Sequence, residues 1–291
     1  MALARSIYFA NLTPMLASGS SYLRSDQLMQ VSRPVLEAAG FHCSLINELI
    51  PVRDALIILN KNSLTAMSPE TIAAAQSAGN RLLGDPLDGL IAYETLAACD
   101  GLIAASLCQN DALRQAFPGK PVHYVAHHVD TRLPAMAPPR DRLRMGYFGE
   151  MLNAAHAQAT ELDVTFVPVN TAQANIVDWM GQLAFFNAHY ALRADRPIDG
   201  PKPFTKGFVA AWCNAPVLID CNDLEARRHL PHDYPFVTDR TDLAAVRDAL
   251  RRMRDGFAGP EWRRAMAAME ELKAQADPNR IARQVLQAVR A

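Results

Sequence analysis

The segment Asp54–Asn60 (DALIILN), whose five central residues are all apolar, constrains the fold more than any other feature of this sequence. A strand without alternating polar positions is typical of a parallel sheet that is buried on both faces. Such a sheet needs helices on both sides, and helical segments do alternate with strand-like segments along the chain. The run ends at Lys61, and polar side chains at the carboxyl ends of parallel strands often carry function.

The first half of the chain has the strand and helix order of a doubly wound α/β domain. The strand expected over Ser6–Asn11 leads through a loop with Gly19, Ser20 and Ser21 to a helix expected over Ser25–Ala39. Gly40 is the residue type that commonly ends a helix. Further strands are expected at residues 41–46, 81–84, 101–106 and 121–126, and further helices at residues 68–79 and 110–117.

The segment Thr131–Asp141 (TRLPAMAPPRD) contains three prolines and almost no periodicity, which predicts a linker between domains. The alternation then starts again, so a second doubly wound α/β domain is predicted. We place the domains at residues 1–135 and 136–275, with a terminal helix at 276–291 that could pack back on the first. In the second domain, strands are expected at 142–149, 163–169, 188–193, 215–220 and 234–239, and helices at 151–161, 171–186, 224–230, 241–255 and 260–274. A further helix is expected to begin near Phe204 or Thr205.

Composition limits the class of protein and its partners. Hydrophobic residues make up 50% of the chain, charged residues 20%, and the formal net charge is −1, so a folded domain is expected and nucleic acid is not expected as a partner. The five cysteines are scattered and never form a C-x-x-C pair, which favours reduced thiols in the cytoplasm. No window approaches the ~20 apolar residues of a membrane span. Arginines 251, 252, 254, 263 and 264 leave a peripheral membrane contact open, although interspersed acids favour a solvated face.

A candidate phosphate site stands at the start of the apolar helix that follows Pro201-Lys202-Pro203. A helix start carries unpaired backbone N–H groups and a partial positive charge, so the hydroxyl of Thr205 and the ammonium of Lys206 would suit a nucleotide's phosphates there. The alternative is that Thr205 only caps the helix and that Lys202, Lys206 and Arg193 are solvated charges.

Two further stretches resemble the GT-B glycosyltransferases. Asp100–Asp130 (DGLIAASLCQNDALRQAFPGKPVHYVAHHVD) is similar to the end of their first domain, and Arg142–Glu150 to the "igYfG" strand that opens their nucleotide-binding domain. The segment PKPFTKGFVAAWCNAPVL takes the place of their E-x7-E donor motif. It resembles bacterial family 4 and family 1-like sugar transferases in which that place has a KPxTK motif. The likeness spans about Ser6 to Asp255, and it implies two Rossmann-like doubly wound α/β domains that face a cleft.

This chain departs from the family motif at two places. The paired glutamates would fall near Pro201 and Val209, so neither carboxylate is present and the ribose contact of the second cannot be carried over. The usual glycine is Asn214, a residue type that still tolerates a left-handed backbone. The stereochemical outcome and the identity of the nucleotide therefore stay open.

The resemblance implies transfer of a sugar from a nucleoside diphosphate donor, without a bound metal or other cofactor, to a saccharide, lipid-linked or protein acceptor. Cations and helix N–H groups would stabilise the departing diphosphate. An inverting enzyme would also need a base. The predicted donor residues are Thr205, Lys206, Arg193, Lys202, Gly149 and Glu150; the acceptor-side residues are Gly19, Ser20, Ser21 and Lys61; and the candidate bases are Asp26, Asp85 and His128.

Each of these assignments has a structural alternative. Gly149 could be a plain turn glycine, Asp85 and Asp88 could form a turn, and His127-His128 could be hinge structure. His189 is expected to be a packed core or capping histidine rather than a ligand. Among functions, a sugar-nucleotide epimerase of the same build and an inactive binding or regulatory protein are the rivals. A dinucleotide oxidoreductase is disfavoured, because no G-x-G-x-x-G follows the first strand of either domain.

Overall fold

The computed structural model describes residues 6–12, 18–49, 51–173, 176–194 and 201–291. Within these ranges the chain forms two compact units. The N-terminal unit comprises the described residues up to Asp130, residues 201–203 and Asp277–Ala291. The C-terminal unit comprises residues 131–194 and 204–276, again within the described ranges. The chain therefore enters the N-terminal unit a second time just before Phe204, and a third time at its end.

A parallel sheet of order β2-β1-β3-β4-β5-β6 forms the centre of the N-terminal unit. The apolar run that predicts a doubly buried strand is β3: all four of its side chains are buried, with Leu56 and Ile58 in one core and Ile57 and Leu59 in the other. The strands are β1 (Ser6–Ala10), β2 (His42–Ile46), β3 (Leu56–Leu59), β4 (Arg81–Gly84), β5 (Gly101–Ala104) and β6 (Val122–Tyr124).

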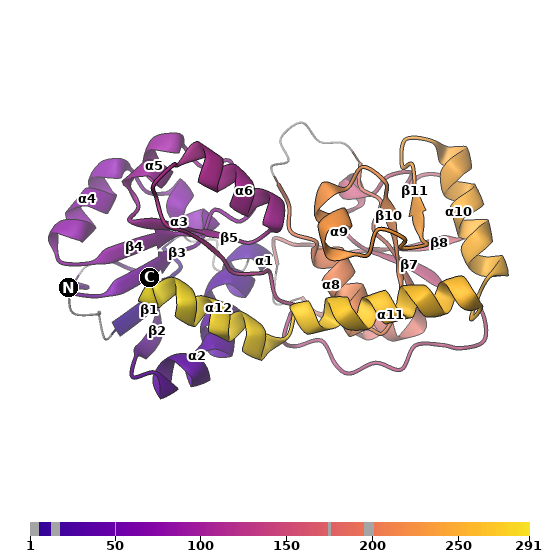
Figure 1. The fold of residues 1–291 in the computed structure, drawn as a ribbon, viewed down its shortest axis with the longest axis horizontal. Helices are drawn as coiled ribbons and strands as arrows, with labels where there is room; N and C mark the ends of the chain where they lie inside the picture. The colour runs from indigo at the N-terminus through magenta and orange to yellow at the C-terminus, as the bar shows by residue number, and fades with distance from the viewer. Residues whose placement is uncertain (1–5, 13–17, 50, 174–175, 195–200) are drawn as a thin grey trace. The chain divides into compact units, whose positions relative to one another are not determined.

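Helices cover both faces of this sheet (Figure 1). One face packs against α2 (Leu28–Ala38) and α12 (Pro278–Arg290), which lie side by side and bury Leu36, Ile281 and Val285. The helices on the other face are α3 (Lys61–Thr65), α4 (Pro69–Ser77), α5 (Tyr93–Ala98) and α6 (Leu107–Ala116). The last helix of the chain therefore completes the core of the first unit.

The C-terminal unit contains a second parallel sheet, of order β11-β10-β9-β7-β8. Two doubly wound α/β units are thus confirmed. The strands are β7 (Met145–Gly149), β8 (Val164–Pro168), β9 (Ala188–Tyr190), β10 (Val217–Asp220) and β11 (Val237–Thr238). The helices are α7 (Asp178–Gln182), α8 (Thr205–Trp212), α9 (Leu224–His229), α10 (Leu243–Asp255) and α11 (Pro260–Gln275), and α11 runs along α8 (Figure 1).

One predicted helix of the second unit is wrong, and another is only partly formed. Residues 151–161 form only a 3₁₀ turn, Met151–Asn153, because the backbone that follows bonds to distant segments instead of to itself. Ala154 pairs with Arg193, and the N–H of Ala155 donates to the carbonyl of Leu192 at 3.1 Å. Among the described residues of 171–186, the predicted helix is present as α7 and a 3₁₀ turn at Leu183–Phe185.

The first helix of the chain differs from its prediction in another way. It begins earlier, as α1 (Gly19–Ser21), and continues into α2 through a π-helical segment, Tyr22–Gln27. π-helical segments are rare and often occur at functional sites. This one carries both Arg24 and Asp26.

Candidate functional site

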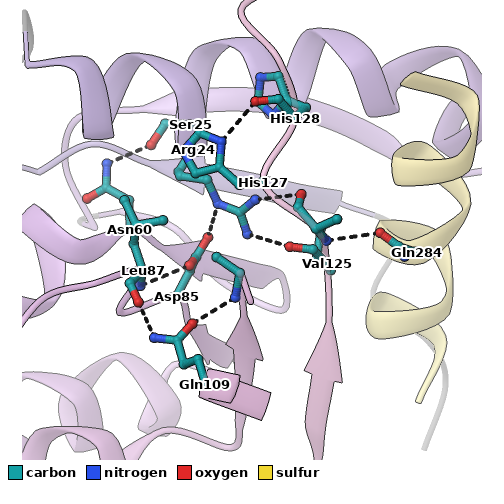
Figure 2. Close-up of polar contacts among 12 residues, drawn as sticks. Arg24, Ser25, Asn60, Asp85, Leu87, Gln109, Val125, His127, His128 and Gln284 are labelled. Carbon is teal, nitrogen blue, oxygen red and sulfur yellow. Dashed lines mark hydrogen bonds and ion pairs between the residues drawn. The ribbon is translucent and has the colours of Figure 1, made fainter. Parts of the chain in front are cut away.

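A buried ion pair lies at the carboxyl ends of the strands in the N-terminal unit (Figure 2). Arg24 is 1% exposed and Asp85 is 0% exposed, and Nε of Arg24 donates to Oδ2 of Asp85 at 2.7 Å. The same guanidinium donates to the carbonyl of Ala126 at 3.1 Å and to that of Val125 at 3.2 Å. Arg24 therefore ties the residues after β4 to those after β6, and Figure 2 shows it at the centre of this network.

This pairing gives Asp85 a structural role. Its other carboxylate oxygen accepts the N–H of Leu87 at 3.3 Å, which fixes the turn after β4. Burial raises the pKa of Asp85, and the charge of Arg24 opposes that shift. A general base must lie within hydrogen-bond reach of the proton that it takes. The predicted role of Asp85 as a base is therefore opposed by its complete burial against Arg24.

His128 is buried as well, at 1% exposure, and its Nε2 lies 3.2 Å from Oε1 of Gln27. Burial holds its pKa well below the ordinary value, so the ring is neutral. Asp26 differs from Asp85 and His128 because it is only half-buried, and burial raises the pKa of its carboxyl. Of the three predicted bases, Asp26 is the one with solvent access.

Lys61 and Lys202 converge on Asp88 in the N-terminal unit. Nζ of Lys61 lies 2.9 Å from Oδ1 of Asp88, and Nζ of Lys202 lies 3.2 Å from Oδ2. Burial raises the pKa of Asp88, but the two lysines outweigh it and lower that pKa to about 2. The structure therefore groups Lys202 with Lys61, whereas the sequence analysis grouped Lys202 with Lys206.

The predicted acceptor-side loop is held by α3. Nδ2 of Asn62 donates to Oγ of Ser18 at 2.9 Å and to Oγ of Ser21 at 2.7 Å. Ser18 caps α1 by accepting the N–H of Ser21, whose side chain is buried, and Gly19 is half-buried. Ser20 lies in α1, and its side chain is outside the part that the structure describes. Ser21 therefore acts as an internal contact of the loop.

In the C-terminal unit, the ammonium of Lys206 lies next to the end of β7. Its Nζ donates to the carbonyl of Phe148 at 2.6 Å and stands 3.9 Å from the ring centroid of Tyr147. Burial, and secondarily the charge of Arg193, lowers the pKa of Lys206 to about 7. Among the described residues no carboxylate forms an ion pair with this lysine. Within the part of the chain that the structure describes, the site thus holds a cation without a protein counter-ion.

The start of α8 presents Lys206 in this position. Phe204 is the N-cap residue, without a side-chain cap, so Thr205 is the first residue of the helix and not its cap. Gly207 leaves room for the ring of Phe204, because an added Cβ would lie 2.1 Å from that ring. The first N–H groups of a helix have no intrahelical partner and favour anions. Thr205 and Lys206 therefore stand where an anion would be stabilised.

Glu150 follows β7 and is held by several neighbours. Its carboxylate accepts a hydrogen bond from Nδ2 of Asn153 at 3.2 Å and another from the hydroxyl of Thr171. The hydroxyl of Tyr147 donates to its backbone carbonyl at 2.8 Å. Tyr147, Asn153 and Thr171 were not among the site residues predicted from the sequence. Strand alternation could have found Tyr147, which shares a face with Gly149, but nothing local indicated Thr171.

Arg193 lies beside the same strand end, where it influences the pKa of both Lys206 and Tyr147. Its backbone pairs with Ala154, and its carbonyl accepts a hydrogen bond from Arg240 at 3.2 Å. Arg240 in turn forms an ion pair with Asp220 at the end of β10. The structure therefore brings together Arg193, Lys206, Gly149 and Glu150 of the predicted donor set.

Gly149 is required by the close approach of Lys206. Its φ is +156°, and an added Cβ would lie 2.9 Å from the hydroxyl oxygen of Tyr147 and 3.0 Å from Nζ of Lys206.

We expect Gly149→Ala to lower the free energy of unfolding by about 1–3 kcal/mol, because a side chain is strained in this conformation. Urea unfolding measures the change. Gly181→Ala is the control, since a Cβ there meets nothing within 4 Å. Equal stability of the two variants would contradict the prediction.

Comparisons with known proteins give structural neighbours only. No protein-family model matches the chain, and no curated protein sequence matches it either.

HepE of Anabaena, solved with UDP and glucose, has a TM-score of 0.62 and 14% identity, over 98% of this chain and 99% of that one. Sucrose-phosphate synthase of Thermosynechococcus elongatus has a TM-score of 0.61 and 14% identity, over 98% of both chains. A glycosyltransferase of Rickettsia africae has a TM-score of 0.66 and 8% identity, over 98% of this chain and 97% of that one. Since identities this low establish only the fold, we conclude that the chain has the GT-B fold, the two-domain α/β architecture of many glycosyltransferases.

Proposed function

We propose that this protein transfers a sugar from a nucleoside diphosphate donor to an acceptor, and that the C-terminal unit binds the donor's diphosphate at the start of α8. The main support for this proposal is the position of the Lys206 ammonium. Its half-buried ammonium is placed against the end of β7 with only a carbonyl and an aromatic ring as partners among the described residues. Burying a cation without a counter-ion is unfavourable. A bound diphosphate would supply the missing charge.

The chemistry follows from the charge that develops on the leaving group. When the bond between the sugar and the diphosphate breaks, negative charge grows on the diphosphate oxygen. Lys206, Arg193 and the N–H groups at the start of α8 are fixed in advance, so they stabilise this charge without reorganising. Removal of one such preorganised donor typically costs ~3–4 kcal/mol in the transition state. In this proposal the protein's own cations neutralise the leaving group, and no divalent ion is required.

The acceptor side of the proposal rests on the N-terminal unit. Asp26 is the predicted base that has solvent access, and its raised pKa brings the carboxyl closer to the range in which it can take a proton from a hydroxyl. Asp26 lies in the π-helical segment that follows α1. We propose Asp26 as the base if the reaction inverts the anomeric centre. The saccharide, lipid-linked or protein nature of the acceptor stays a prediction. No described helix is long and apolar enough to cross a membrane.

A melting experiment tests donor binding directly. UDP is the first nucleotide to try, since HepE was solved with it, and GDP, dTDP and CMP complete the set. A ligand at 100 times its Kd stabilises a protein by about 2.7 kcal/mol, which raises the melting temperature by several degrees. We expect such a shift with at least one nucleotide, and we expect it to be lost in Lys206→Ala because the ammonium that faces the diphosphate is gone.

The matched control is Lys202→Ala. This lysine is only four residues away, but it pairs with Asp88, so its loss should leave the nucleotide shift unchanged. An undiminished shift in Lys206→Ala would move the phosphate site elsewhere. A wild-type protein that no nucleotide stabilises would refute donor binding altogether.

A further inference from the structure

We infer that Glu150 recognises a vicinal diol of the donor, on the ribose or on the transferred sugar, and thereby favours ligands that carry this diol. This inference rests on the proposed function, because it assigns a second contact to the same donor site. It gives the carboxylate a role other than phosphate binding.

The position of Glu150 places a carboxylate beside the proposed diphosphate site. It directly follows Gly149, whose missing Cβ leaves room for Nζ of Lys206, and it extends β7 beyond the carbonyl that Lys206 contacts. The hydroxyl of Tyr147 donates to the backbone carbonyl of Glu150 at 2.8 Å, and Nζ of Lys206 stands 3.9 Å from the centroid of the same ring, so Glu150 and Lys206 both lie beside one tyrosine. A ligand whose phosphates meet Lys206 would therefore have neighbouring atoms close to Glu150.

The side chain of Glu150 is fixed from two other segments. Asn153, in the 3₁₀ turn after β7, donates to one carboxylate oxygen at 3.2 Å, and the hydroxyl of Thr171, after β8, donates to the other. Neither donor is charged, and among the described residues no basic side chain forms an ion pair with Glu150. The carboxylate is thus oriented by neutral hydrogen bonds while it keeps its negative charge.

That charge decides which ligand group Glu150 can contact. A carboxylate repels phosphate oxygens, so its ligand partner must be a hydrogen-bond donor. An ionised carboxylate offers about four lone-pair positions, and Asn153 and Thr171 occupy two of them. Two adjacent hydroxyl groups would fill the other two. In a nucleotide sugar, the ribose and the transferred sugar both carry such a pair of hydroxyls.

Calorimetric titration of the full chain distinguishes these two sources. The probes are UDP, GDP and ADP, each paired with its 2′-deoxy form, together with UDP-glucose. If Glu150 contacts the ribose, we expect the wild-type protein to bind the best ribonucleotide at least about tenfold more tightly than its deoxy form, because hydrogen bonds to a charged group are the stronger ones. Glu150→Gln should reduce that preference to less than threefold, and its affinity for the deoxy form should stay equal or rise.

If Glu150 contacts the transferred sugar instead, the ribose and deoxyribose forms should bind equally well, and UDP-glucose should bind more tightly than UDP. Glu150→Gln should then remove the advantage of UDP-glucose. Thr171→Val provides a second variant on an exposed side chain, and it should move the same preference in the same direction but by less. That graded effect is expected only if Thr171 positions the carboxylate.

Two results would overturn the inference while leaving the proposed function intact. One is a folded Glu150→Gln protein that binds nucleotides but keeps every wild-type preference. The other is a Glu150 effect that appears only with added Mg²⁺ and vanishes with a chelator, which would make Glu150 a ligand of a metal ion. By contrast, a wild-type protein that binds none of the probes would refute the proposed function and this inference together.

Discussion

Arg24→Ala is expected to lower the free energy of unfolding by about 3–5 kcal/mol, because it leaves the carboxylate of Asp85 buried without its cation. Asp85 is 0% exposed, so water cannot replace the guanidinium without rearrangement. The variant also leaves the carbonyls of Val125 and Ala126 without the hydrogen bonds that they accept from Arg24. Urea unfolding followed by circular dichroism measures the loss as a lower midpoint at unchanged slope.

An exposed arginine of α2 provides the matched control. Arg33 lies 3.9 Å from Glu37, with both side chains about half exposed, and such a surface pair contributes little. Arg33→Ala should therefore change stability by less than about 1 kcal/mol. A double variant, Arg24→Met with Asp85→Leu, should recover much of the loss, since replacing both members of a buried pair with apolar residues is often neutral. Equal effects of the two single variants would contradict a buried structural role for Arg24.

Nucleotide affinity is expected to fall as pH rises above 7, because the pKa of Lys206 in the free protein is lowered to about 7. Below pH 7 the ammonium is already charged and can meet the diphosphate. Above pH 7 the free amine must first take up a proton, so Kd should rise about tenfold per pH unit until the pKa of the bound state is reached. The window for measurement is pH 7 to 9. The final ionisation of the phosphate groups has a pKa of ~6, so these groups no longer titrate in this window.

Two variants test whether Lys206 causes this slope. Lys206→Arg keeps a charge that does not titrate, so its affinity should be flat over the same window. Lys206→Met should bind weakly at every pH. A wild-type slope that persists in Lys206→Met would assign the titration to another group.

Through Lys206, a rise in pH should stabilise the folded chain, although the same rise weakens nucleotide binding. Its pKa is lower in the folded chain than the ordinary value of 10.5, so the folded state binds fewer protons between pH 7 and 10.5. The unfolding free energy should therefore rise with pH across this window in the wild-type protein relative to Lys206→Met. The ligand-free Lys206→Met protein should be more stable at pH 7, as expected when a binding group is kept at a cost in stability.

Local sequence patterns predicted much of the fold. Each core strand was indicated by a short apolar segment, and the helix predicted over residues 68–79 is observed as α4, which Ser68 caps. Asn214 was expected to tolerate a left-handed backbone, and its φ is +53°. The burial of His189, with its pKa lowered to about 3 by desolvation, agrees with the expected core histidine. These features depend on residues that are close together in the chain.

The sequence by itself therefore determined the α/β alternation, the two units and the helix that presents Lys206. Only the tertiary structure decided which charges meet. Asp85 is neutralised by a residue 61 positions away, Lys202 is held by Asp88, and Glu150 is oriented by Thr171 from a segment predicted as helix. The physical reason is that burial and ion pairing depend on the packing of distant segments. Periodicity and capping report only local backbone preference, so they cannot distinguish a solvated charge from a buried one.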